Sequence, residues 1–306
     1  MSSDPIVVGT DGSASAELAV DRAGELGQAL DACVCVVSAY SSTPDGERAA
    51  PAGGTAVAER SGTERAETIV AKSRERLDGL GISVRTQTCS SDPGQALVTI
   101  AQDEHAQMIV VGNRGMTGAR RILGSVPNDV SHHARCGVLI VPTQLRSRPG
   151  GAPLTGGPIV VGTDGSETAS LAVKESIRLA KALGAELHIT SSYKPLAGVK
   201  IHGAPPGEAA AWGVYPDSHV EAVLDEAAAR ARAEGVTANA HASKRDPTDA
   251  LMDVAETVDA AMIVVGSKGM HGIERLTVGN VPNQVSHKGL WNVLIAYTGE
   301  PNAAAA

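Results

Sequence analysis

The stretch IVVGTDGS occurs twice in this chain, at residues 6–13 and again at residues 159–166. The Ile-Val-Val-Gly run is short, apolar and β-branched, which is typical of a fully buried parallel strand. The Thr-Asp-Gly-Ser that follows predicts a turn whose serine caps a helix. A buried strand that leads directly into a helix is the first unit of an α/β fold, so the repetition predicts two such folds in one chain.

The duplication extends over almost the whole sequence. Three further blocks recur in the same order: IVVG at 109–112 and 263–266, SVPN at 125–128 matched by NVPN at 280–283, and VLI at 138–140 and 293–295. The offset between the copies drifts only from 153 to 155 residues. A period of this length corresponds to a whole domain and not to a solenoid repeat. The length of 306 residues also fits two domains of about 150 residues each.

Strand-like and helix-like segments alternate within each copy. The predicted strands cover residues 5–9, 32–40, 82–88, 107–111 and 137–141 in the first copy, and 158–162, 185–193, 236–242, 261–265 and 292–296 in the second. A polar-faced helix is predicted over 63–79, and Asp92-Pro93 and Asp246-Pro247 each combine a helix cap with a first-turn proline. This alternation predicts an α/β fold in which each copy has a five-stranded parallel sheet with helices on both faces.

The composition also marks the domain boundaries. Residues 144–157 are rich in Gly and Pro, which predicts a linker. The first domain then covers residues 1–143 and the second covers residues 158–298, with a tail at 299–306.

The composition excludes two classes of partner. Aromatic residues make up 2% of the chain, Phe is absent, and the net charge is −8. Aromatic base-stacking platforms and a basic surface are therefore not expected, so we predict no nucleic-acid partner. No apolar run approaches the roughly 20 residues that cross a bilayer, and the N-terminus lacks the pattern of a secretory signal. We therefore expect a cytoplasmic protein without a membrane partner.

A glycine-rich segment follows the fourth predicted strand of each copy. The glycines are Gly112, Gly115, Gly118 and Gly124, followed by Ser125, in the first copy, and Gly266, Gly269, Gly272 and Gly279, followed by Asn280, in the second. Glycines let the backbone approach a ligand closely, and successive N–H groups form a nest for phosphate oxygens. The helix that starts near Val126 or Val281 directs its positive end at the same place. The alternative interpretation is a tight loop without a ligand.

An aspartate follows the first strand of each copy, Asp11 in the first and Asp164 in the second. If the first and fourth strands are neighbours where the strand order reverses, Asp11 faces the glycine loop across one crevice. A carboxylate there suits a ribose hydroxyl or an adenine amino group. The alternative is an aspartate that only stabilises its turn. The P-loop pattern and the GxGxxG pattern after the first strand, the two common nucleotide fingerprints, are absent.

Taken together, the aspartate after the first strand and the G-x2-G-x(8 or 9)-G-[S/N] loop after the fourth resemble the universal stress protein family, in two tandem copies. The resemblance implies the adenine nucleotide alpha-hydrolase-like fold, with strand order 3-2-1-4-5 in each copy. It also implies ATP binding, as in family members that carry the motif. Because the fifth strand often mediates dimer contacts in the family, we expect an intramolecular pseudo-dimer of the two halves or a homo-oligomer.

The resemblance assigns residues to two sites. In the first copy it places Gly9, Asp11 and Ala39 on the adenosine side, and Gly112, Gly115, Gly124, Ser125 and Val126 on the ribose and phosphate side. The corresponding residues of the second copy are Gly162, Asp164 and Ser192, and Gly266, Gly269, Gly279, Asn280 and Val281. The loop residues Asn113, Arg114, Gly118 and Arg121, and Ser267, Lys268 and Gly272, complete the candidate set.

The expected function is therefore an ATP-binding regulator of a stress response, with Mg²⁺ accompanying the nucleotide and an unknown protein partner. No catalytic residue and no metal-ligand set can be assigned, so binding is favoured over catalysis. The two loops depart from the family pattern: the first has eight residues between its second and third motif glycines, and the second has Asn280 where Ser or Thr is usual. The alternatives are a slow ATPase or nucleotide-converting enzyme, and a ligand-free interaction scaffold.

Overall fold

The computed structural model describes residues 3–40, 54–113, 123–142, 153–193, 216–267, 280–288 and 291–299. The first half contains β1 (Ser3–Gly9), α1 (Ala14–Leu30), β2 (Ala32–Tyr40), α2 (Gly54–Leu77), β3 (Val84–Ser90), α3 (Pro93–Asp103), β4 (Met108–Gly112), α4 (Ser125–His133) and β5 (Gly137–Val141). The second half contains β6 (Ile159–Gly162), α5 (Glu167–Leu183), β7 (Leu187–Ser192), α6 (Pro216–Ala233), β8 (Ala238–Ser243), α7 (Pro247–Thr257), β9 (Met262–Gly266), α8 (Asn280–Lys288) and β10 (Asn292–Ala296). The two halves have the same order of elements, as the duplication predicts.

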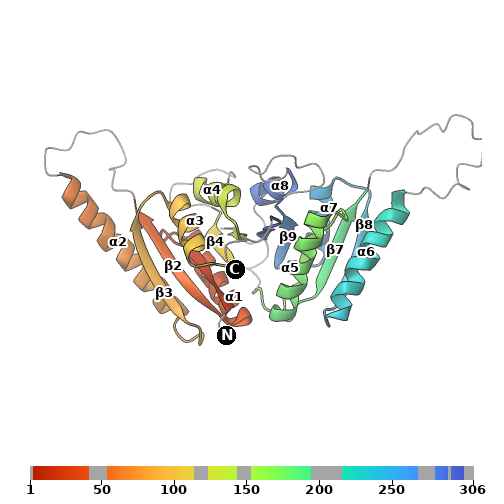
Figure 1. Cartoon of the computed structure of the whole chain (residues 1–306), viewed down its shortest axis with the longest axis horizontal. Helices are drawn as coiled ribbons and strands as arrows, with labels where there is room; N and C mark the ends of the chain where they lie inside the picture. The colour runs from red at the N-terminus through yellow and green to blue at the C-terminus, as the bar shows by residue number, and fades with distance from the viewer. Residues whose placement is uncertain are drawn as a thin grey trace, which may run out of the picture.

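The strands form one ten-stranded sheet in the order β3-β2-β1-β4-β5-β10-β9-β6-β7-β8 (Figure 1). Each half has the expected order 3-2-1-4-5, and neighbouring strands within a half are parallel. The strand order reverses between β1 and β4 in the first half and between β6 and β9 in the second. The α/β class, the parallel pairing and the position of this switch point are thus confirmed.

The two halves meet through their fifth strands. β5 and β10 are antiparallel, with Leu139 opposite Leu294 and one further pair on each side. Leu139 and Leu294 are equivalent residues of the two copies, so an approximate two-fold axis passes between them. The expected pairing of the halves is confirmed, and its physical form is a continuous sheet that spans both halves.

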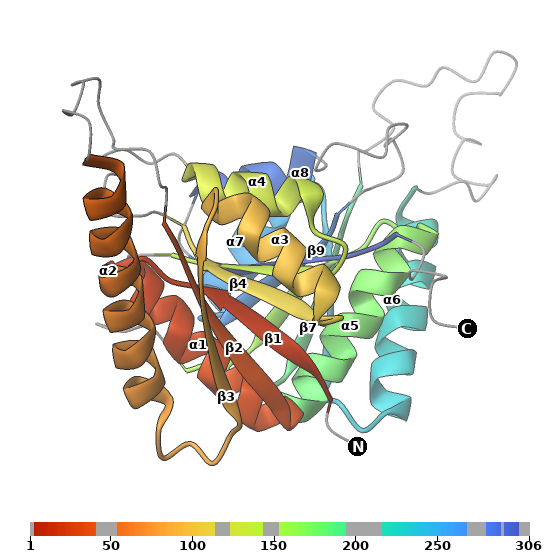
Figure 2. The ribbon, with the colours of Figure 1, turned by 60° about the vertical axis from the view of Figure 1, so that its left-hand side comes forward.

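Helices cover both faces of this sheet (Figures 1 and 2). Alternate strand residues point to opposite faces, so Ile6 and Leu187 pack under α1, α2, α5 and α6, while Val7 and Ile109 pack under α3, α4, α7 and α8. The buried apolar side chains are mostly Val, Ile, Leu, Ala and Met, which fill both layers in a chain without Phe. Among the helices in the described ranges, none combines the length and the apolar character that a bilayer span needs.

Two helix starts predicted from the sequence are confirmed. Asp92 accepts hydrogen bonds from the N–H groups of Gly94 (3.0 Å) and Gln95 (3.2 Å) at the start of α3. Asp246 accepts one from the N–H of Thr248 (3.0 Å) at the start of α7. Each helix begins with a proline directly after its cap, so these starts are determined locally.

Helix α2 starts earlier than the predicted helix over 63–79, because it begins at Gly54. Gly62, which precedes the predicted helix, lies inside the observed one. A Cβ added at Gly62 would lie 2.8 Å from Cδ2 of Tyr40, so the absent side chain allows close packing on the end of β2. This tertiary contact explains why a residue with low helix propensity occurs inside the helix.

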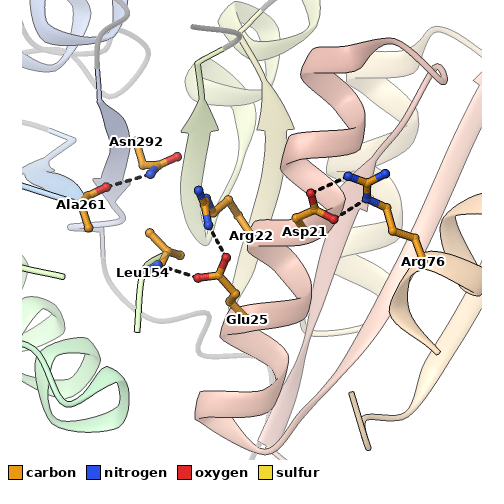
Figure 3. A network of polar contacts seen from close by, with 7 residues as sticks. All are labelled: Asp21, Arg22, Glu25, Arg76, Leu154, Ala261 and Asn292. Carbon is orange, nitrogen blue, oxygen red and sulfur yellow. Dashed lines mark hydrogen bonds and ion pairs between the residues drawn. The ribbon is translucent and has the colours of Figure 1, made fainter. Parts of the chain in front are cut away.

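The last residues of the predicted linker contact both halves, and one of them, Leu154, is packed in the core. Leu154 is 1% exposed, and its N–H donates a hydrogen bond to Oε2 of Glu25 on α1 (Figure 3). The N–H of Gly156 donates to the carbonyl of Leu183 on α5 (2.8 Å). This end of the linker therefore connects a helix of the first half to a helix of the second.

Candidate functional site

The turn after β1 is built around Asp11. Oδ1 of Asp11 accepts a hydrogen bond from the N–H of Ser13 (2.9 Å), and Ser13 in turn caps α1 by accepting one from the N–H of Ala16 (3.3 Å). Gly12 between them has a φ of +77°, which glycine adopts without strain. Asp11 therefore stabilises its turn, and its half-buried carboxylate is held at the carboxyl end of β1.

The end of β4 is in direct contact with the start of α1. A Cβ added at Gly112 would lie 2.4 Å from Oγ and 2.9 Å from the backbone of Ser15. The hydroxyl of Ser15 is 3.3 Å from Oδ1 of Asn113, to which it donates a buried hydrogen bond. These contacts bring the segment after β1 and the segment after β4 to one place at the switch point. The sequence patterns did not single out Ser15, and the equivalent residue of the second copy is Thr168.

Helix α4 begins at the same place. The N–H of Gly124 donates to the carbonyl of Asn113 (2.9 Å), which closes the connection between β4 and α4. Gly124 occupies the cap position and provides no side-chain hydrogen bond to the helix. Ser125 is exposed and Val126 is half-buried. The first-turn amides and the positive end of the helix dipole therefore lie beside the end of β4, and a helix start of this kind can bind an anion. We call Asp11, Asn113, Gly124 and Ser125 the first switch site.

Two of the candidate glycines have a packing role of their own. A Cβ added at Gly9 would lie 2.7 Å from Cδ1 of Leu97 on α3, and one added at Gly162 would lie 3.2 Å from Cδ1 of Leu251 on α7. These glycines allow a helix to approach the end of β1 or β6. Ala39 and Ser192, the other candidates on the adenosine side, are half-buried at the carboxyl ends of β2 and β7.

The second half repeats the turn, and its Ser267 is bonded to a partner of a different kind. Oδ1 of Asp164 accepts a hydrogen bond from the N–H of Ser166 (3.0 Å), as Asp11 does in the first half. Ser267, the counterpart of Asn113, instead contacts the hydroxyl of Thr298 (2.7 Å). Oδ1 of Asn280 accepts a hydrogen bond from Nε2 of Gln284 (2.9 Å) within α8. We call Asp164, Ser267 and Asn280 the second switch site, which also includes the half-buried ends Gly266 and Val281.

Comparison with known proteins agrees with this architecture. The model of the universal stress protein family matches residues 3–142 and again residues 157–296. The chain belongs to the universal stress protein family. Universal stress protein Rv1636 of Mycobacterium tuberculosis (strain ATCC 25618 / H37Rv) is 41% identical over 140 residues, which are 45% of this chain and 95% of that protein. A universal stress protein of Mycolicibacterium smegmatis is 25% identical over 298 residues, which are 95% of this chain and 96% of that protein.

A solved structure shares the fold over the full length. The crystal structure of a universal stress protein from Archaeoglobus fulgidus superposes with a TM-score of 0.71 at 20% identity and covers 98% of each chain. The tandem arrangement of two universal stress protein halves is therefore supported by sequence and by fold.

Part of the universal stress protein motif lies outside the described residues. These positions are Arg114, Gly115, Gly118 and Arg121 in the first loop and Lys268, Gly269, Gly272 and Gly279 in the second. Among the residues that the structure describes, no three His, Cys, Asp or Glu side chains are grouped so as to hold a metal ion.

Proposed function

We propose that this universal stress protein binds ATP, accompanied by Mg²⁺, in each of its two halves and acts as a nucleotide-responsive regulator of a stress response. One observation carries the proposal: the amino end of α4, which lacks a side-chain cap, begins at the carboxyl end of β4, at the switch point that Asp11 borders. Amides and a hydroxyl suit phosphate oxygens, and a carboxylate suits ribose hydroxyls or the adenine amino group. The motif resemblance supports ATP as the nucleotide.

Two sites are proposed because both halves carry the aspartate, the glycine loop and the following helix. We expect their affinities to differ. In the first half Asn113 is bonded to Ser15, whereas in the second half Ser267 contacts Thr298 and the amide oxygen of Asn280 is bonded within its own helix. The phosphate sides of the two sites therefore present different donors.

The direct test is mass spectrometry of the small molecules released from freshly purified full-length protein, followed by calorimetric titration of the stripped protein with ATP, with and without Mg²⁺. We expect up to two equivalents of ATP and an increase in thermal stability. At 100-fold excess over Kd, one bound ligand adds about 2.7 kcal/mol to the free energy of unfolding. An unchanged melting temperature at saturating ATP would favour the ligand-free scaffold and contradict the proposal.

Single substitutions separate the two sites. Asp11→Ala should abolish binding of the first equivalent of ATP, and Asp164→Ala binding of the second. Asp78→Ala, which removes an exposed carboxylate just beyond α2, is the control and should bind both equivalents. Ser125→Glu places a negative charge at the start of α4. This charge interacts favourably with the helix dipole, which stabilises the fold by about 0.3–1 kcal/mol, but it repels phosphate. This variant should keep its fold and lose the first equivalent. Normal stoichiometry in both Asp11→Ala and Ser125→Glu would exclude the first switch site.

The enzymatic alternative is tested by phosphate release. Turnover above about 1 per second would place the protein among ordinary enzymes. We expect turnover far below this rate, because the switch site provides no assigned general base for the attacking water.

A further inference from the structure

Two histidines face each other on the outer strands of the second half. His188 lies on β7 and His241 on the edge strand β8, at the right of Figure 1. Nδ1 of His188 and Nε2 of His241 are 3.0 Å apart and share a hydrogen bond, and the ring centroids are 5.2 Å apart. His188 is 7% exposed, whereas His241 is half-buried at the sheet edge. His241 is thus the more exposed partner of the pair.

The first half has no such pair at the same place. The strand registers make Cys35 the counterpart of His188 and Gln87 the counterpart of His241. His188 is also the second residue of β7, near the amino edge of the sheet, whereas Asp164 follows the carboxyl end of β6. The histidine pair therefore belongs neither to the fold that both halves share nor to the second switch site.

A carboxylate lies on the other side of His188. Oε2 of Glu186 is 3.8 Å from Nε2 of His188, the ring nitrogen that does not face His241. A metal-bound histidine usually directs its second ring N–H to a carboxylate, which fixes its tautomer and orientation. Glu186, His188 and His241 are thus arranged in the order carboxylate, imidazole, imidazole.

Burial favours the neutral form of both rings. Burial lowers the pKa of His188, against a smaller opposing effect of Glu186. Burial also lowers the pKa of His241, and the neighbouring His188 adds to this effect. Neutral imidazole is the form that binds metal ions, so burial acts in the direction that favours a ligand role.

We propose that Nδ1 of His188 and Nε2 of His241 together bind one divalent transition-metal ion of the class that prefers imidazole, namely Ni²⁺, Cu²⁺ or Zn²⁺. Metal–nitrogen bonds of about 2.0–2.1 Å place two adjacent ligand atoms about 3 Å apart, and the observed separation is 3.0 Å. The metal ion replaces the proton that the two nitrogens share in the free protein, and the single ring proton of His188 then lies on Nε2, 3.8 Å from Oε2 of Glu186. Because Glu186 lies on the far side of the ring, the site has two protein ligands, and water completes the coordination.

The test is calorimetric titration of the untagged, chelator-treated full-length protein with NiCl₂ in the absence of nucleotide. Ni²⁺ is the preferred probe because cysteine thiolates bind Zn²⁺ more readily than Ni²⁺, and the first half contains four cysteines that could compete for Zn²⁺. We expect one equivalent of Ni²⁺ and an increase in melting temperature. His241→Asn should abolish both effects, and Glu186→Gln should weaken binding by about 10–100-fold. His219→Asn, which removes an exposed histidine of α6, is the matched control and should bind normally.

Each outcome decides the proposal. Loss of the equivalent in His241→Asn, with retention in His219→Asn, supports the site. Equal binding by wild type and His241→Asn, or no binding by wild type, overturns it. Because His241 is at the sheet edge, its variant is expected to fold, and a cooperative unfolding transition without metal verifies this. Unchanged affinity in Glu186→Gln would overturn the role of Glu186 in positioning His188.

Discussion

Gly112 is packed directly against the backbone of Ser15 at the start of α1. Gly112→Ala should therefore lower the free energy of unfolding by about 1–3 kcal/mol, because the added methyl group meets backbone atoms that cannot rotate away. Gly137→Ala at the start of β5 is the control, since a Cβ there would lie 3.4 Å from Cδ1 of Leu294, an ordinary contact. Chemical denaturation of both variants checks the prediction, which equal stabilities would contradict.

This residue also shows where sequence reasoning ends. The spacing of the glycines predicts the loop and its place after β4, but not what each glycine faces. Gly112 meets Ser15, a residue far away in the sequence, so its role appears only after the strand order has brought the two segments together. Gly9 is similar, because its nearest neighbour is a side chain of α3. The motif therefore locates the site, while the fold decides which of its glycines are needed for packing.

The histidine pair gives the stability a specific pH dependence. Burial lowers the pKa of both His188 and His241 below the ordinary value of about 6.5 that applies in the unfolded chain. The unfolded chain therefore binds more protons just below pH 6.5, and the folded state loses stability as the pH falls through this value. The loss levels off below the folded-state pKa values, where both states are protonated.

The measurement is denaturant unfolding between pH 7.5 and 5 in the presence of a metal chelator. His241→Asn should show a shallower loss of stability over this range than wild type. His219→Asn should follow the wild-type curve, since it removes a histidine from an exposed helix surface. A wild-type pH dependence that persists unchanged in His241→Asn would contradict the assignment.

At the scale of the elements, local signals determine several helix starts. Asp92 caps α3 through two backbone N–H groups, so Asp92→Ala should cost about 1 kcal/mol and Asp92→Ser should restore most of it. Asp103→Ala, at the opposite end of the same helix, removes a carboxylate from the negative end of the dipole and should be neutral or slightly stabilising. Thermal unfolding distinguishes the two, and equal losses would mean that capping is not the cause.

The strands and most helices can be predicted because each is specified by an apolar run or a cap of a few neighbouring residues. The start of α2 cannot be predicted in this way, because Gly62 packs against the ring of Tyr40 on another element. The antiparallel seam between β5 and β10 cannot be derived from either strand alone, since both read as buried apolar strands. Only the family resemblance suggested that the fifth strands pair, and the structure gives the register.

At the scale of the whole molecule, the two halves are similar but carry inverted charges beside the seam. α1 has Arg22 followed by Glu25, and the equivalent positions of α5 have Glu175 followed by Arg178, each an ion pair within its helix. α1 and α5 pack against each other across the seam. Each helix thus neutralises its own pair of charges, and the order of the two signs differs between the halves.

The first of these ion pairs is also the place where the linker is attached. The side chain of Arg22 is 4% exposed, and Glu25 binds both its guanidinium and the N–H of Leu154 (Figure 3). The side chains of Glu175 and Arg178 are 28% and 42% exposed. The two ion pairs therefore differ mainly in the burial of the arginine, because the side chain of Glu25 is still 24% exposed.

Leu154 tests whether this attachment contributes to the stability of the whole chain. Leu154→Ala keeps the backbone N–H that Glu25 accepts but removes a fully buried side chain, so it should cost about 2–5 kcal/mol. Leu171→Ala on α5 is the matched control, because that leucine is 40% exposed, and it should change stability by no more than about 0.5 kcal/mol. Since Leu154 packs in a core cluster shared by residues of both halves, unfolding followed separately by probes in each half should shift together. A loss confined to the second half would instead mean that the linker is packed on one half and does not couple them.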